Sequence, residues 1–140
     1  SPLAVAYARE HAARRGACVT FFEHDAVSQT LPDGYDILTS SLFLHHLAEA
    51  EALGFLRSLA AAGELAIVDD LRRGLPGWAV AHLGTRLLSR SRVAHVDGPR
   101  SVEGAFTTDE VRDLAHRAGW DDFEVRPRWP WRMLLIGRFG

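Results

Sequence analysis

The sequence predicts an α/β fold in which a mostly parallel sheet ends in an antiparallel hairpin. Short apolar runs alternate with helical segments, and the stretch from residue 35 to residue 68 has the pattern strand, helix, strand with short connections. Such a unit places its two strands parallel. The sequence ends in two β-rich runs separated by a turn, which is the pattern of a β-hairpin. The 140 residues, of which 47% are hydrophobic and 24% charged, suit one globular domain.

The charge of the chain excludes some classes of partner. Lys and Arg number 16 against 18 Asp and Glu, so the net charge is −2, and both signs are spread along the sequence. No basic footprint for nucleic acid or for an anionic membrane is visible. No apolar run reaches the roughly 18 residues that a membrane span needs, and no leader-like segment opens the sequence. We therefore expect a cytoplasmic protein without nucleic-acid or membrane partners, whose single cysteine, Cys18, is free.

The first 30 residues contain a predicted helix and a predicted strand. Ser1 suits the N-cap and Pro2 the first helical position, where a missing N–H is tolerated. The helix should end at Gly16. A β-rich run at 18–23 then predicts a strand, which leads into a His-Asp pair. The helix residues expected to be buried, at helical spacing, are Leu3, Ala4, Tyr7, Ala8 and His11.

The central part of the chain carries the strand–helix–strand unit. A strand is predicted at 35–40 and a helix at 48–62, which Gly63 should close in the left-handed conformation. The apolar run 64–68 then predicts a strand that is covered on both faces. The helix positions expected to face the core are Leu53, Leu56, Leu59 and Ala60.

The last part of the chain should add one helix and the hairpin. Residues 75–104 indicate an amphipathic helix followed by an irregular stretch. Thr107 and Glu110 form a capping box for a helix that runs through Ala118. Residues 123–139 predict the antiparallel hairpin, with a Trp- and Pro-rich turn in its middle.

Polar segments follow each of the three predicted strands. They are His24-Asp25, residues 40–46 and residues 69–73. Ligands of open α/β sheets bind outside the carboxyl ends of the strands, because loops and helix N-termini converge there. We therefore expect the three segments to share one rim of the sheet, where the candidate site lies.

Four segments stand in a recognisable order, namely SPLAVAYA at 1–8, FEHDA at 22–26, YDILTSSLFLHHL at 35–47 and the terminal hairpin. In this order and spacing the chain resembles the class I S-adenosylmethionine-dependent methyltransferases. The resemblance is strongest to the small-molecule branch, which includes ubiquinone and menaquinone biosynthesis enzymes, and it covers most of the chain. It implies a Rossmann-like fold and S-adenosylmethionine as the cofactor.

The resemblance also implies a set of cofactor-binding residues. Asp25 would accept a hydrogen bond from the adenine amino group, and the backbone N–H of Ala26 would meet the ring. Ser40 and Ser41 would line the methionine end of the cofactor. Phe43 would face the methyl group.

The acceptor side of the site follows from the same resemblance. Residues 43–45 would face the methyl group and the acceptor, and residues 75–104 would form a lid-like insertion. Our own hypothesis is that His45 is the base that removes the acceptor proton. The residues expected to bind the acceptor are Asp69, Asp70, Arg72, Trp78 and His82. No metal is predicted. The expected partner is a small-molecule acceptor, and a homodimer is compatible with the sequence.

One departure from the family pattern is large. The Gly-rich loop after the family's first strand and the acid that binds the ribose should lie just upstream of Ser1, and neither is present. Close approach of the backbone to the cofactor needs that loop. We expect an N-terminally truncated methyltransferase fold, with a natural protein that extends upstream by very roughly 70 to 100 residues.

Several of these site residues also have a purely structural interpretation. Asp25 could cap its own turn, and Asp69 with Asp70 could cap the following segment. His45 and His46 would point in opposite directions at a strand end, so only one can reach the pocket, and we expect His45 there and His46 in the packed side. A metal site of these histidines and Asp69 is conceivable by ligand type, but no spacing signature supports it.

Three functional hypotheses remain. The leading hypothesis is methyl transfer from S-adenosylmethionine to an oxygen or carbon of a small acceptor, aromatic or polyketide-like. The alternative is a non-catalytic, truncated methyltransferase-like module that only binds a partner. A nucleotide-dependent oxidoreductase on a similar sheet is a third reading, and Ser-His-Asp hydrolysis is disfavoured because no G-x-S-x-G elbow follows a strand.

Overall fold

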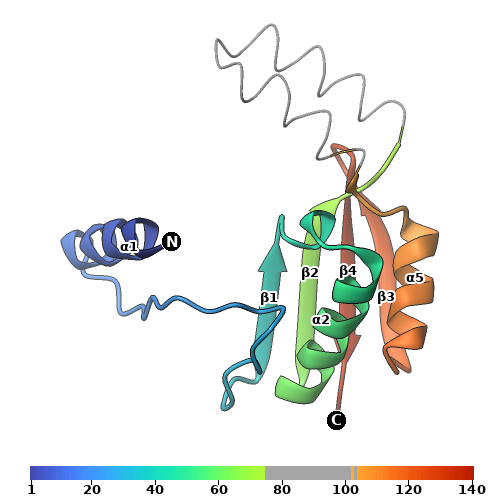
Figure 1. Ribbon diagram of the computed structural model, residues 1–140, viewed down its shortest axis with the longest axis horizontal. Helices are drawn as coiled ribbons and strands as arrows, with labels where there is room; N and C mark the ends of the chain where they lie inside the picture. The colour runs from blue at the N-terminus through green and yellow to red at the C-terminus, as the bar shows by residue number, and fades with distance from the viewer. Residues whose placement is uncertain (75–101, 103) are drawn as a thin grey trace, which may run out of the picture. The chain divides into compact units, whose positions relative to one another are not determined.

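A computed structural model describes residues 1–74, 102 and 104–140 of the chain. Contacts divide these residues into two compact units, Ser1–Thr30 and Leu31–Gly140. Figure 1 shows the helix of the first unit and the sheet of the second. Within the described ranges, no helix is long and apolar enough to cross a membrane.

The first unit contains helix α1, Pro2–Arg14, which starts as predicted with Ser1 at the N-cap. The glycine after it, Gly16, adopts the left-handed φ of 63° that ends the helix. The prediction of a buried stripe was wrong: α1 has no buried residue, and Leu3 and Tyr7 are 81% and 63% exposed. The spacing of apolar residues shows which face of a helix is apolar. That face is buried only if another element packs against it, and in this unit only one irregular segment accompanies α1.

The predicted strand at 18–23 was also wrong, because these residues have no regular secondary structure. A strand needs a neighbour for its backbone groups, and the first unit has no second extended segment to pair with. The Arg9 guanidinium holds this stretch to α1 by donating two hydrogen bonds to the Phe21 carbonyl oxygen, at 2.9 and 2.6 Å.

The second unit is built on a four-stranded sheet with the order β1-β2-β4-β3. Its strands are β1 Ile37–Ser41, β2 Leu65–Leu71, β3 Asp122–Arg128 and β4 Arg132–Arg138. β1 and β2 are parallel, as the strand–helix–strand pattern predicted. β4 pairs antiparallel with both β2 and β3, so the predicted hairpin is confirmed and its second strand lies next to β2.

Helices α2, Glu49–Ala62, and α5, Thr108–Arg117, cover one face of this sheet (Figure 1). Burial alternates along β2 and β4, and the buried positions form the face under the helices. The core residues contributed by the two strands and α2 are Ala52, Phe55, Leu56, Leu59, Ala66, Val68, Met133 and Leu135. Leu56 and Leu59 are in this core as predicted, whereas Leu53 and Ala60 are only half-buried.

Two glycines permit close approaches in this unit. Gly63 is extended, with φ −158°, so its predicted left-handed conformation was wrong. A Cβ on Gly63 would lie 3.0 Å from the Tyr35 carbonyl oxygen, so the glycine lets the chain enter β2 directly beside that backbone. A Cβ on Gly137 would lie 2.4 Å from Trp120, whose indole nitrogen donates to the Leu56 carbonyl oxygen at 3.0 Å.

Candidate functional site

The site begins where β1 ends and the chain turns sharply. Leu42, directly after β1, has a left-handed φ of 54°, which is strained for a residue with a Cβ. Its backbone N–H donates to the Asp69 carbonyl oxygen at 3.0 Å, which ties the turn to β2. The chain then forms the short 3-10 helix η1, Leu44–His46. No glycine marks this bend, so the sequence pattern did not show it.

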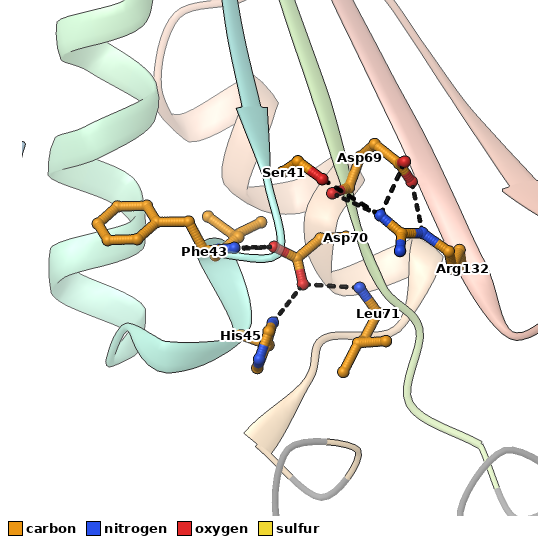
Figure 2. Close-up of polar contacts among 8 residues, drawn as sticks. Ser41, Phe43, His45, Asp69, Asp70, Leu71 and Arg132 are labelled. Carbon is orange, nitrogen blue, oxygen red and sulfur yellow. Dashed lines mark hydrogen bonds and ion pairs between the residues drawn. The ribbon is translucent and has the colours of Figure 1, made fainter. Parts of the chain in front are cut away.

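Asp70 of β2 lies at the centre of the turn, and its side chain is fully buried (Figure 2). Its carboxylate accepts from the backbone N–H groups of Phe43, Leu44 and Leu71 at 2.8, 2.7 and 2.6 Å, and it contacts His45 Nδ1 at 2.6 Å. A buried carboxylate is tolerated only when such partners replace water. All four partners come from this chain, so Asp70 holds the turn in place.

His45 lies beside Asp70 in η1 and is 8% exposed. An ionised carboxylate can only accept, so the contact assigns the proton of the neutral ring to Nδ1 and leaves Nε2 as the basic nitrogen. His46 is exposed, and the centre of its ring lies 4.0 Å from that of His45. The prediction that His46 packs inward was wrong: residues 44–46 form a helical turn, so the alternation of a strand does not apply.

Asp69 points the other way and forms a second cluster on the opposite face of the sheet. Arg132 of β4 donates from Nε and Nη2 to the Asp69 carboxylate oxygens at 2.9 and 2.8 Å. The same Nη2 lies 3.4 Å from Ser41 Oγ. Ser41 and Asp69 are opposite each other in the β1–β2 ladder. Figure 2 shows the two clusters separated by strand β2.

The other predicted site residues of the second unit lie close to these clusters. Phe43 is half-buried, and its ring packs edge-on against Phe55 with 5.2 Å between the centres. Ser40 is half-buried in β1, opposite Val68. Arg72 continues β2, and its backbone N–H donates to the Trp131 carbonyl oxygen at 2.9 Å. The second and third predicted segments therefore meet at one rim of the sheet.

Asp25 and Ala26 belong to the first unit. The Asp25 carboxylate caps the turn that follows it, accepting from Ser28 Oγ at 2.6 Å and from the Val27 N–H at 3.0 Å. These bonds, that from Ser28 Oγ above all, lower the pKa of Asp25 below its usual value of 3.8. Asp25 is exposed and ionised at neutral pH, so turn capping does not exclude a contact with a ligand.

Some predictions are not addressed, and one residue was missed. Trp78, His82 and nearly all of the lid-like insertion 75–104 lie outside the described residues. Arg132 was not predicted, because a single Arg at the start of a hairpin strand carries no motif. Among the described residues, no group of three His, Cys, Asp or Glu side chains is arranged to hold a metal.

A separate hollow of about 470 Å³ lies between α2 and α5. Its charged walls are ion-paired with one another: Arg117 contacts Glu49 at 2.7 Å, and Arg73 contacts Glu110. None of the predicted site residues lines it. This hollow is therefore separate from the candidate site.

Comparison with known proteins shows similarity at the level of structure. No family model and no curated protein sequence matches the chain, whereas 181 chains of solved structures do. PigF with SAH matches with a TM-score of 0.70 and 20% identity, over 99% of this chain and 46% of PigF. The S-adenosylmethionine-dependent methyltransferase SibL matches with a TM-score of 0.70 and 16% identity, over 99% of this chain and 41% of SibL.

A human protein shows the same likeness. N-acetylserotonin methyltransferase in complex with SAM matches with a TM-score of 0.59 and 19% identity, over 86% of this chain and 34% of the human chain. The chain thus spans less than half the length of each of these three proteins. Over the part that it spans, it has a methyltransferase-like α/β fold.

Proposed function

We propose that this chain is part of an enzyme that transfers a methyl group from S-adenosylmethionine to an oxygen or carbon of a small acceptor, aromatic or polyketide-like. The buried pair of His45 and Asp70 carries the proposal. The fold likeness supports it, because PigF and the human enzyme were solved with SAH and SAM. The motifs in residues 1–47 add independent support from the sequence.

His45 is the proposed base. Asp70 fixes the ring with Nδ1 at 2.6 Å, so Nε2 is the nitrogen that can take a proton from the acceptor. Asp70 itself is a positioning residue, because its carboxylate is fully buried and its partners are all within the chain. This replaces the direct contact with the acceptor that the sequence suggested for Asp70.

Methyl transfer is a displacement that depends mainly on alignment of the acceptor atom, the methyl group and the sulfur. S-adenosylmethionine would supply the methyl group already activated as a sulfonium. Asp25 and Ala26 would hold its adenine, and Ser40, Ser41 and Phe43 its methionine end. On the acceptor side, the proposed residues are Asp69, Arg72, Trp78 and His82.

The first test is binding of S-adenosylhomocysteine to the full-length protein, measured by calorimetry. A 1:1 complex, together with methylation of a phenol panel read by mass spectrometry, is the expected result. Binding without turnover on any acceptor would favour the non-catalytic module instead. Absence of binding would remove the methyltransferase proposal.

A further inference from the structure

Arg72 follows Leu71, the last residue of β2, and its backbone stays in the sheet. Its N–H donates to the Trp131 carbonyl oxygen at 2.9 Å, and on its other side it forms a parallel bridge with Phe106. Side chains two residues apart in a strand point to the same face. The side chain of Arg72 therefore leaves the sheet on the face of Asp70, with its Cα about 7 Å further along the strand.

A second contact agrees with this placement. Residues paired in a ladder point to the same face, and Phe106, the bridge partner of Arg72, lines the hollow on the helix-covered face. The segment that contains Phe106 runs beside η1, because a Cβ on Gly104 would lie 3.0 Å from the His45 carbonyl oxygen. Arg72 and His45 therefore border the same part of the rim.

The guanidinium of Arg72 lacks the partners that other arginines of the chain have. Of the arginines that the structure describes, only Arg72 and Arg132 are half-buried. Arg132 is paired with Asp69 at 2.8 Å, whereas the Arg72 side chain has no hydrogen bond or ion pair with a described residue. Its nitrogens remain open to solvent, since the one buried and unpartnered side-chain nitrogen or oxygen of the described residues belongs to His24.

An unpartnered, half-buried guanidinium favours an anionic ligand. The group is charged at physiological pH and carries five N–H donors but no acceptor. Partial burial removes some of the water that would satisfy these donors and reduces the screening of the charge. A carboxylate matches the planar fork of donors, because its two oxygens accept two parallel hydrogen bonds.

We propose that Arg72 determines acceptor specificity by binding a carboxylate, so that the acceptor is a small aromatic acid. The carboxylate binds Arg72, and the atom to be methylated lies at His45 Nε2 on the same face of the sheet. A neutral phenol would leave the guanidinium without a partner and would bind more weakly. This inference rests on the proposed function, because it names the class of acceptor for the same site.

The test compares aromatic acids with their neutral amides. The full-length protein is saturated with S-adenosylhomocysteine, and the three isomers of hydroxybenzoate and of hydroxybenzamide are titrated into it in a calorimeter. Wild type should bind at least one acid about tenfold to a hundredfold more tightly than its amide, the usual effect of a hydrogen bond to a charged group. Arg72→Met should bind that acid and its amide with equal affinity, because methionine keeps an unbranched apolar stem without a donor.

Two further variants keep the test decisive. Arg72→Gln also removes the charge but keeps a polar end, and it should lose the preference for the acid in the same way; it decides the matter if Arg72→Met does not fold. Arg138→Met is the matched control, because it removes the same charge from an exposed residue at the far end of β4. It should keep the preference of wild type. Unchanged affinity for S-adenosylhomocysteine shows that a variant is folded.

The outcomes separate this inference from the methyltransferase proposal. If wild type binds S-adenosylhomocysteine but prefers no acid over its amide, the role of Arg72 is overturned while the methyltransferase proposal stands. The same conclusion follows if the variants without the Arg72 charge keep the preference. If wild type does not bind S-adenosylhomocysteine, both proposals fail. Loss of the preference in the Arg72 variants, but not in Arg138→Met, supports the assignment.

Discussion

Two adjacent acids, Asp69 and Asp70, have opposite surroundings. Asp70 is fully buried, and Asp69 is half-buried on the other face of the sheet with Arg132. Alternation along β2 separates them, since successive side chains of a strand point to opposite faces. One residue therefore contacts His45, while its neighbour binds Arg132 on the other face.

The proposed base can be tested without removing its bond to Asp70. His45→Asn offers an amide N–H in place of Nδ1–H, so the buried carboxylate keeps its partner while the basic nitrogen is lost. We expect nearly unchanged cofactor affinity and a methyl-transfer rate about 10²- to 10⁴-fold lower. Single-turnover kinetics and calorimetry on the full-length protein measure the two quantities.

The control is His46→Ala, which removes an exposed ring next to His45. Its stability should change by less than about 0.5 kcal/mol. His45→Ala, in contrast, should cost about 1–3 kcal/mol of folding stability, because it leaves Asp70 without one of its partners. A methyl-transfer rate of His45→Asn equal to that of wild type would exclude His45 as the base.

Asp25 carries a prediction of its own. Asp25→Ala should weaken S-adenosylmethionine binding by roughly tenfold to a hundredfold, the usual effect of removing a polar partner from a ligand. Ser28→Ala, which removes only the cap bond to Asp25, should weaken it much less. Equal affinity of Asp25→Ala and wild type in calorimetry would leave Asp25 as a turn cap alone.

At the level of elements, α5 shows the clearest link between sequence and stability. The Glu110 N–H donates to Thr107 Oγ1 at 3.2 Å, and the Thr107 N–H donates to Glu110 Oε2 at 2.8 Å, as the capping box predicted. Thr107→Ala should lower the free energy of unfolding by about 1 kcal/mol. Thr108→Ala, one residue later and not the cap, should change it by less than about 0.5 kcal/mol. Urea denaturation followed by circular dichroism distinguishes the two.

The stability that the α5 cap provides should depend on pH. Hydrogen bonds from the Thr107 N–H and side chain, together with Arg73, lower the pKa of Glu110 below its usual 4.5. A lowered carboxyl pKa stabilises the fold above the unfolded-state value, and this stabilisation is lost as the pH falls through the folded-state pKa. The stability difference between wild type and Glu110→Gln should therefore be larger at about pH 6 than at about pH 3. An equal difference at both pH values would contradict this.

Elements whose signals are local were predictable from the sequence. The Thr107 cap, the parallel β1–β2 pair and the hairpin all followed from caps, periodicity and turn residues. The predicted strand at 18–23 was wrong because a strand forms only beside a neighbouring strand. The short helix η1 was not predicted, because nothing in the sequence signals the left-handed conformation of Leu42. Arg132 could not be found for a related reason, since only the register of β2 with β4 brings it to Asp69.

For the whole molecule, β1 is the feature with the largest consequence. It is an edge strand of the described sheet, and Ile37 at its start is 56% exposed. Exposed edges with apolar side chains pair with other chains. We expect the 140-residue chain made alone to be oligomeric or poorly folded. Sedimentation and a thermal melt check this, and a cooperative monomeric transition would count against it.

The close packing of Gly137 against Trp120 has an effect at the other end of the sheet. Gly137 pairs with Ala66 and fixes the alignment of β4 on β2. A slip of one residue turns every side chain of a strand to the opposite face. In β4 such a slip would turn Arg132 to the face under the helices, so Asp69 would lose the guanidinium that binds it. The ion pair of Arg132 with Asp69 thus depends on a glycine at the other end of the same strand.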